Sequence, residues 1–274
     1  MKRAKRTIVV LSLALAGCQG TIAPPAATPQ VFSLQLLTTP EMVALVQELA
    51  AEFTPDSGVI SLHGVTTRWD SALQQVQTGQ APYALMSFVP ASAALWAAPI
   101  GYDGLAIIVH AGNPVAALMI EQVRQIFQGR ITSWDEVGGL PLPITIVAQA
   151  PNTEFSQVFQ AQVMDGQRIT PSARLALSNA RMIDLVAQTP GAIGYVSLAA
   201  LDDRVRAVPL DYDSTPIAPT RATVSSGAYP LRTPIVVVGL AAPDEHSIYR
   251  EWFAWMQSAA GQAIVGRRYG TLLP

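Results

Sequence analysis

Four short groups of polar residues, each at the end of an apolar run, could bind a ligand. Such runs are typical of buried strands. Hydroxyl and amide side chains, like the free N–H groups at a helix start, can hydrogen-bond a polar or anionic ligand, and an arginine adds a positive charge. The candidate ligand-binding residues are Thr38, Thr39, Thr66, Thr67, Arg68, Ser87, Asn152 and Thr153.

The corner at residues 146–155, IVAQAPNTEF, is the most distinct of these groups. The apolar run stops at Gln149, and an amphipathic run begins at Phe155, so Asn152 or Thr153 reads as a helix N-cap. The N–H groups and dipole of a helix start favour an anion. The corner contains no Arg or Lys, however, and its nearest charge is Glu154. The residues alone therefore leave open whether it binds an anion, another ligand or nothing.

Residue patterns of catalysis and metal binding are missing from the chain. His63, His110 and His246 lie far apart and lack a metal-binding spacing such as H-E-x-x-H. The sequence also lacks a G-x-S-x-G motif, a P-loop and a G-x-G-x-x-G motif. We therefore expect a binding protein that is not an enzyme, with no metal and no cofactor.

Two groups of neighbouring aspartates offer an alternative, because paired carboxylates can perform acid–base catalysis. They are Asp202-Asp203 and Asp211 with Asp213. Both lie in polar stretches, near Arg204 and Arg206, which favours a solvated surface over a reaction centre.

The N-terminus has the pattern of a bacterial lipoprotein signal. A basic stretch, MKRAKR, precedes an apolar run at residues 7–16 that is too short to span a membrane. Leu15-Ala16-Gly17-Cys18 then resembles a lipobox, in which Cys18 is lipidated; the alternative is a plain cysteine in an ordinary signal. We predict a signal peptide at residues 1–17 and a Pro/Ala/Thr-rich tether at 18–30, which anchor the protein to a membrane outside the cytoplasm.

The charge of the remaining chain limits its partners. Both lysines lie within residues 1–17, and without that segment 13 arginines face 19 acidic residues, a net charge of −6. Lysine-based catalysis is thereby excluded, and an acidic exported protein is not expected to bind nucleic acid. Cys18 is the only cysteine of the chain, so the folded part can form no disulfide.

Short apolar runs alternate with amphipathic ones after residue 31, which is typical of an α/β fold. In a parallel sheet, ligands bind at the carboxyl ends of strands, so the loops after the first three strands belong to one edge. We expect strands at 32–37, 59–65, 83–87, 105–109, 144–147, 191–198, 205–210 and 234–240, and helices at 40–53, 71–77, 119–127, 154–159, 179–188 and 249–265.

The stretch IGYDGLAIIVHAGNPVAALMIEQVRQIFQGRITSWDEVGG (100–139) resembles a segment of the phosphate-binding proteins that serve phosphate ABC importers. GAIGYVSL (191–198), YPLRTPIVVV (229–238) and the C-terminal stretch 251–274 are similar to later segments of that family. The resemblance runs in order from about residue 32 to the end. It implies a bilobed type II periplasmic binding protein fold: two doubly wound α/β domains joined by two crossing segments. By analogy, lobe 1 comprises residues 31–106 and 232–274, and lobe 2 comprises residues 107–231.

The same resemblance implies changes at the ligand site. Gln149 stands where the family has an arginine, Asn152-Thr153 replaces Gly-Ser, and Glu154-Phe155 replaces Gly-Thr. Loss of the arginine removes the strongest type of anion contact, and a carboxylate at this place repels phosphate. Arg68 could replace the missing cation from the other lobe; the alternative is an exposed loop arginine.

The resemblance therefore implies a monomeric solute-binding lipoprotein that holds phosphate or another small polar solute between its lobes and passes it to an ABC permease. The alternative is a sensor or envelope scaffold that has kept the fold and lost the phosphate pocket.

Overall fold

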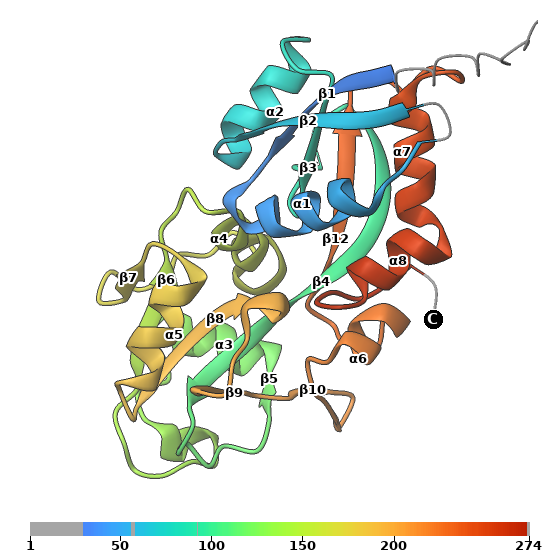
Figure 1. The fold of residues 1–274 in the computed structure, drawn as a ribbon. Coiled ribbons are helices and arrows are strands. Elements are labelled where there is room, and N and C mark those ends of the chain that lie inside the picture. Colours follow the sequence, from blue (N-terminus) through green and yellow to red (C-terminus); the bar gives the residue numbers. More distant parts are fainter. Residues whose placement is uncertain (1–29, 56–57, 92, 273–274) are drawn as a thin grey trace, which may run out of the picture.

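The computed structural model describes residues 30–55, 58–91 and 93–272, which form two α/β lobes (Figure 1). The predicted signal peptide, Cys18 and the tether up to residue 29 lie outside the described residues. Within the described ranges, no helix is long and apolar enough to cross a membrane.

Lobe 1, the upper lobe of Figure 1, contains a sheet with helices on both faces. Its strands run in the order β2-β1-β3-β12-β4; β1 pairs in parallel with β2 and β3, and β12 is antiparallel to β3 and β4. The elements are β1 (Gln30–Thr38), β2 (Gly58–Thr66), β3 (Tyr83–Met86), β12 (Arg232–Gly239), α1 (Val43–Glu52), α2 (Trp69–Gln77), α7 (Ile248–Gln257), α8 (Ala259–Val265) and a short 3₁₀ turn, Pro40–Met42.

Alternating side chains of the lobe 1 strands divide its core into two layers, because neighbouring residues of a strand point to opposite faces. On one face, Leu36 and Val237 pack with α1, α7 and α8. On the other, Leu37 and Val238 pack with α2. Both faces are thereby covered, as expected for a doubly wound lobe.

Lobe 2 repeats this plan around β4, β8 and β6. α3 and α4 cover one face with a core that contains Phe127 and Phe159, and α5 covers the other with Met182 and Val186. Its elements are β6 (Thr145–Gln149), β7 (Arg174–Ala176), β8 (Ala192–Ser197), β9 (Val205–Ala207), α3 (Ile120–Phe127), α4 (Glu154–Phe159), which continues as a π-helical turn to Met164, α5 (Asn179–Ala187) and α6 (Arg221–Ser226), with a small separate sheet of β5 (Leu118–Met119), β10 (Leu210–Tyr212) and β11 (Thr215–Ile217).

One long strand, β4 (Trp96–His110), runs through both lobes (Figure 1). It pairs with β12 as far as Gly104 and with β8 from Leu105 onward. This change of partner lies two residues before the predicted boundary after residue 106, and we propose that the lobes divide near this point. The two lobes, joined through β4, confirm the predicted bilobed α/β class.

Two predicted elements are each divided in the structure. The predicted helix 249–265 is two helices, because Ser258 is extended (φ −73°, ψ 168°) and ends α7. The predicted strand 205–210 is also two strands, β9 and β10, which pair in different sheets. Both breaks depend on packing partners elsewhere in the chain, which local patterns do not reveal.

Candidate functional site between the lobes

A buried carboxylate joins the two lobes at the place where their strand-end loops meet. Glu154, the first residue of α4 in lobe 2, is 1% exposed. The Thr39 hydroxyl donates a hydrogen bond of 2.7 Å to its Oε2 atom. The backbone N–H groups of Ser87 and Phe88 donate to its Oε1 atom, at 2.5 and 2.9 Å. All three donors come from lobe 1, so Glu154 bridges the cleft.

The surroundings of this carboxylate favour its neutral form. Burial raises the pKa of Glu154 to about 7, although the hydrogen bonds from Thr39, Ser87 and Phe88 oppose the increase. The nearby Glu41 raises it further, and the pKa of Glu41 is itself raised by burial. The three donors therefore compensate only partly for the removal of the charge from water.

Local hydrogen bonds hold the start of α4 in place. Thr153 is the N-cap of α4. Its hydroxyl accepts a hydrogen bond from the N–H of Ser156 at 3.2 Å and donates one to Gln149 Oε1 at 2.9 Å. Gln149 in turn donates to Asn179 at 2.8 Å. The hydroxyl of Thr153 is therefore engaged within lobe 2, which fixes the direction in which Glu154 leaves the helix.

A cavity of about 290 Å³, named here the Glu41 cavity, lies on one side of this bridge. It contains four of the predicted ligand-binding residues. Its lining comprises Thr39, Pro40, Glu41, Arg68, Trp69, Ala150, Asn152, Thr153, Glu154, Leu177 and Ser178. The side chain of Arg68 is 62% exposed and forms an ion pair with Asp70.

A second cavity of about 360 Å³, named here the Gln162 cavity, lies between α4 with its π-helical turn and the strands β4 and β12. Two buried polar atoms of its lining, Ser87 Oγ and Gln162 Oε1, have no hydrogen-bond partner. Its lining comprises Ser87, Phe88, Val89, Ala97, Val158, Ala161, Gln162, Thr233, Pro234 and Val236. Glu154 accepts hydrogen bonds from residues of both cavities and thus lies between them.

The remaining predicted residues lie near the cleft without lining either cavity. Thr38 is buried and its hydroxyl donates to the backbone oxygen of Thr39 at 3.3 Å. Thr66 ends β2 on the surface, and the N–H of Thr67 donates to the backbone oxygen of Thr38 at 2.9 Å. These three residues shape the loops that carry Thr39 and Arg68.

Sequence reasoning missed the contributions of Phe88, Gln162 and Thr233. Phe88 acts through its backbone N–H, which every residue except proline carries, so no sequence signal could reveal it. Thr233 donates to the backbone oxygen of Ser87 at 2.8 Å, and Gln162 donates to that of Arg232 at 3.0 Å. The end of β3, the start of β12 and the π-helical turn after α4 bring these residues together from distant parts of the sequence.

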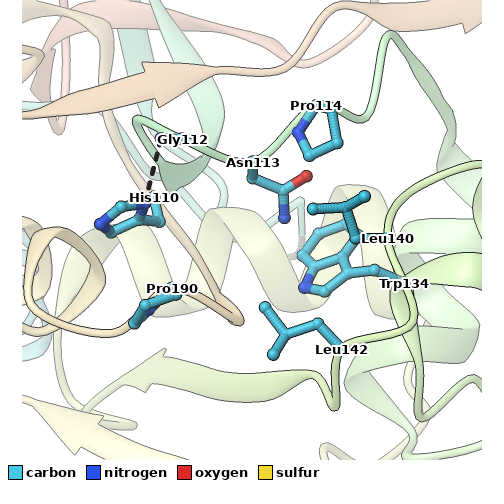
Figure 2. Close-up of a pocket in the computed structure, with 8 residues that line it drawn as sticks. All are labelled: His110, Gly112, Asn113, Pro114, Trp134, Leu140, Leu142 and Pro190. Atoms are coloured by element: carbon cyan, nitrogen blue, oxygen red, sulfur yellow. Dashed lines mark hydrogen bonds between the residues drawn. The ribbon is translucent and has the colours of Figure 1, made fainter.

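Figure 2 shows a third, smaller pocket of about 140 Å³, whose lining in lobe 2 includes His110, Asn113 and Trp134. His110 Nδ1 accepts from the N–H of Gly112, Asn113 Oδ1 accepts from that of Val115, and the indole N–H of Trp134 donates to the Gly191 carbonyl oxygen. Since these groups support the surrounding loops, we give this pocket no role in binding. In the part of the chain that the structure describes, no three His, Cys, Asp or Glu side chains form a metal site.

Comparison with known proteins identifies the family. A family model described as a PBP superfamily domain matches residues 23–260. The chain belongs to this family. Its fold is also that of two solved proteins of the type II class. It superposes with a TM-score of 0.73 and 23% identity on an ABC-type phosphate transport receptor from Vibrio cholerae, over 88% of this chain and 100% of the receptor. It also superposes, with a TM-score of 0.75 and 24% identity, on a putative phosphate ABC transporter substrate-binding protein with bound phosphate from Clostridium perfringens. This match covers 89% of this chain and 100% of that protein.

Two curated relatives are both phosphate-binding proteins named PstS. The chain is 29% identical to the Bacillus subtilis protein over 130 residues, which are 47% of this chain and 41% of the relative. It is 21% identical to the Borreliella burgdorferi protein over 173 residues, which are 60% and 61% of the two chains. The matches thus span about half the length of these relatives. The predicted resemblance to phosphate-binding periplasmic proteins is confirmed at the level of family and fold.

Proposed function

We propose that this chain is an extracytoplasmic solute-binding protein that takes up a small polar solute between its lobes and delivers it to an ABC permease. The observation that carries this proposal is the meeting of strand-end loops from both lobes beside the Glu41 cavity, with the hydrogen-bond donors of lobe 1 directed into the cleft. The similarity to phosphate transport receptors supports the transport role. Lipid attachment at Cys18 and a monomeric state are part of the proposal.

The charges of the Glu41 cavity favour a neutral or cationic polar solute over phosphate. Glu41 and Glu154 line it, and the charge of Arg68 is paired with Asp70. A phosphate ion would meet two carboxyl groups and no unpaired arginine among these lining residues. Three donors that could hold its oxygens, the Thr39 hydroxyl and the backbone N–H groups of Ser87 and Phe88, are already bonded to Glu154. Phosphate binding of the strength expected of a transport receptor is therefore not part of the proposal.

A thermal-shift panel on the purified protein tests this function. Neutral, cationic and anionic metabolites are compared at concentrations from micromolar to millimolar, and hits are confirmed by calorimetry. We expect a neutral or cationic solute to raise the melting temperature, because a ligand at about 100 times its Kd stabilises by about 2.7 kcal/mol. A rise of several degrees with micromolar phosphate would contradict the proposed solute class, and a panel without any saturable binder would contradict the solute-binding function.

The second candidate, a sensor or scaffold of the cell envelope, is favoured by one observation: the side chain of Glu154 itself occupies donors of lobe 1 that could otherwise hold an anionic solute. Neighbouring genes for a permease and an ATPase would support transport. Their absence, together with a negative solute panel, would support the sensor or scaffold.

A further inference from the structure

The Glu154 side chain is held as a bound carboxylate ion would be held. Both of its oxygens accept hydrogen bonds, one from the Thr39 hydroxyl and the other from two successive N–H groups, those of Ser87 and Phe88. These donors lie 115, 67 and 66 residues away in the sequence and belong to the other lobe. The acceptor is therefore supplied by one lobe and its whole set of donors by the other.

The donors are positioned by lobe 1 itself. Ser87 and Phe88 follow directly on β3, and the backbone oxygen of Ser87 is fixed by Thr233 on β12. Thr39 ends the loop after β1, where its backbone oxygen accepts from the N–H of Met42 at 3.0 Å. Two strand ends of one sheet thus hold the three donors, which is the arrangement of a preformed oxyanion site.

We propose that Thr39, Ser87 and Phe88 form an oxyanion-binding site for small carboxylates, and that the chain fills this site with its own Glu154 as an internal ligand that holds the lobes together. The inference goes beyond the proposed function, because it holds whether or not a solute is transported. Since the internal carboxylate is attached to the chain, a free anion must compete with its high effective concentration. The native protein is therefore insensitive to free carboxylates.

The heavy atoms of the Glu154 side chain beyond Cβ are those of an acetate ion. In the variant Glu154→Ala, acetate can enter from the adjoining Glu41 cavity, which Glu154 lines, and accept hydrogen bonds from the same donors, with its methyl group displaced from the remaining Cβ atom. We expect about 100 mM acetate, compared with chloride at equal ionic strength and pH 7.5, to raise the melting temperature of this variant by about 3 °C or more. The native protein shows no such saturable rise.

Two matched variants separate the site from general salt effects. Glu154→Gln keeps the shape of the side chain and blocks the site, so it gains no acetate response. The double variant Thr39→Val/Glu154→Ala lacks one donor, so its acetate response is weaker than that of Glu154→Ala. The melting temperature of Glu154→Ala is also measured with phosphate, which shows whether the emptied site accepts oxyanions in general or only carboxylates of this size. A rise with acetate supports the site whether or not phosphate also raises the melting temperature.

An acetate response of Glu154→Ala no larger than that of Glu154→Gln would overturn the inference, as would a response that Thr39→Val leaves unchanged. If Glu154→Ala does not fold in chloride, it is refolded with and without acetate and followed by circular dichroism. Recovery of the folded signal with acetate supports the site, and equal failure in both salts refutes it. The solute panel on the native protein is a separate measurement, so failure of one proposal is distinguishable from failure of the other.

Discussion

Replacing Glu154 by glutamine removes the charge from the bridge between the lobes while keeping its shape. The side-chain oxygen of glutamine can accept from the N–H groups of Ser87 and Phe88, and its NH₂ group can donate to the Thr39 hydroxyl oxygen. The three hydrogen bonds of the native side chain thus have counterparts in the variant. The two proteins therefore differ mainly in whether residue 154 can ionise.

The magnitude follows from the pKa of this carboxyl group. Burial raises the pKa of Glu154 from the ordinary value of 4.5 to about 7. Because the folded-state pKa is higher than the unfolded one, the stabilisation linked to this group is fully present below about pH 4.5 and is lost as the pH rises through 7. At about 1.4 kcal/mol for each pH unit between the unfolded and folded pKa values, the loss of stability amounts to about 3 kcal/mol. The glutamine variant does not ionise and is spared this loss.

The assay is urea unfolding of the native protein and Glu154→Gln between pH 4.5 and 8.5. We expect the free energy of unfolding of the variant, relative to the native protein, to rise by about 3 kcal/mol across this range. Asp103, whose pKa burial raises to about 6, adds a similar pH dependence to both proteins, so it cancels in the comparison. Asp103→Asn is the matched control: its free energy of unfolding, relative to the native protein, should rise around a lower pH. A difference between native protein and Glu154→Gln that stays constant with pH would refute the reasoning, because Glu154 would then be ionised throughout.

Three further substitutions test the description of the site and core. Thr39→Val leaves one oxygen of the buried Glu154 without its donor, and it should lower the free energy of unfolding in urea by about 1–3 kcal/mol. The control Thr38→Val removes a hydroxyl that is bonded only at 3.3 Å to a backbone oxygen, so it should lower the free energy of unfolding by less. Equal losses in the two variants would contradict the bridge. Phe159→Ala removes a fully buried ring whose centroid lies 3.9 Å from that of the stacked Tyr195 ring. This substitution should destabilise the protein by about 3–5 kcal/mol, which a thermal melt would show as a large decrease in Tm. Arg68→Ala should leave the midpoint of urea unfolding nearly unchanged, because the ion pair with Asp70 is exposed; a clear decrease of the midpoint would show that this arginine has a structural role.

The sequence predicted most elements because their signals are local. Strand and helix periodicity located β1, β2, β3 and α3 to within about two residues. The first half of β4 was missed because its glycines and proline resemble a turn, and its strand partner β12 lies more than a hundred residues later in the chain. Gly101 shows why a glycine is needed there: a Cβ atom would lie 2.7 Å from Val265 and 2.9 Å from the Gly270 oxygen.

The sequence by itself determined the α/β class, the family resemblance and the four loops that meet at the cleft, because these depend on local patterns and on motifs within continuous segments. It also showed that an acid, Glu154, begins α4 without a neighbouring arginine. Only the tertiary structure decided where that acid points. Its hydrogen bonds join residues more than sixty positions apart, and two of its three donors are backbone N–H groups, which carry no side-chain signature. An acid at a helix start is ordinarily solvated, and the packing of lobe 1 over α4 turns this one into a buried bridge between the lobes.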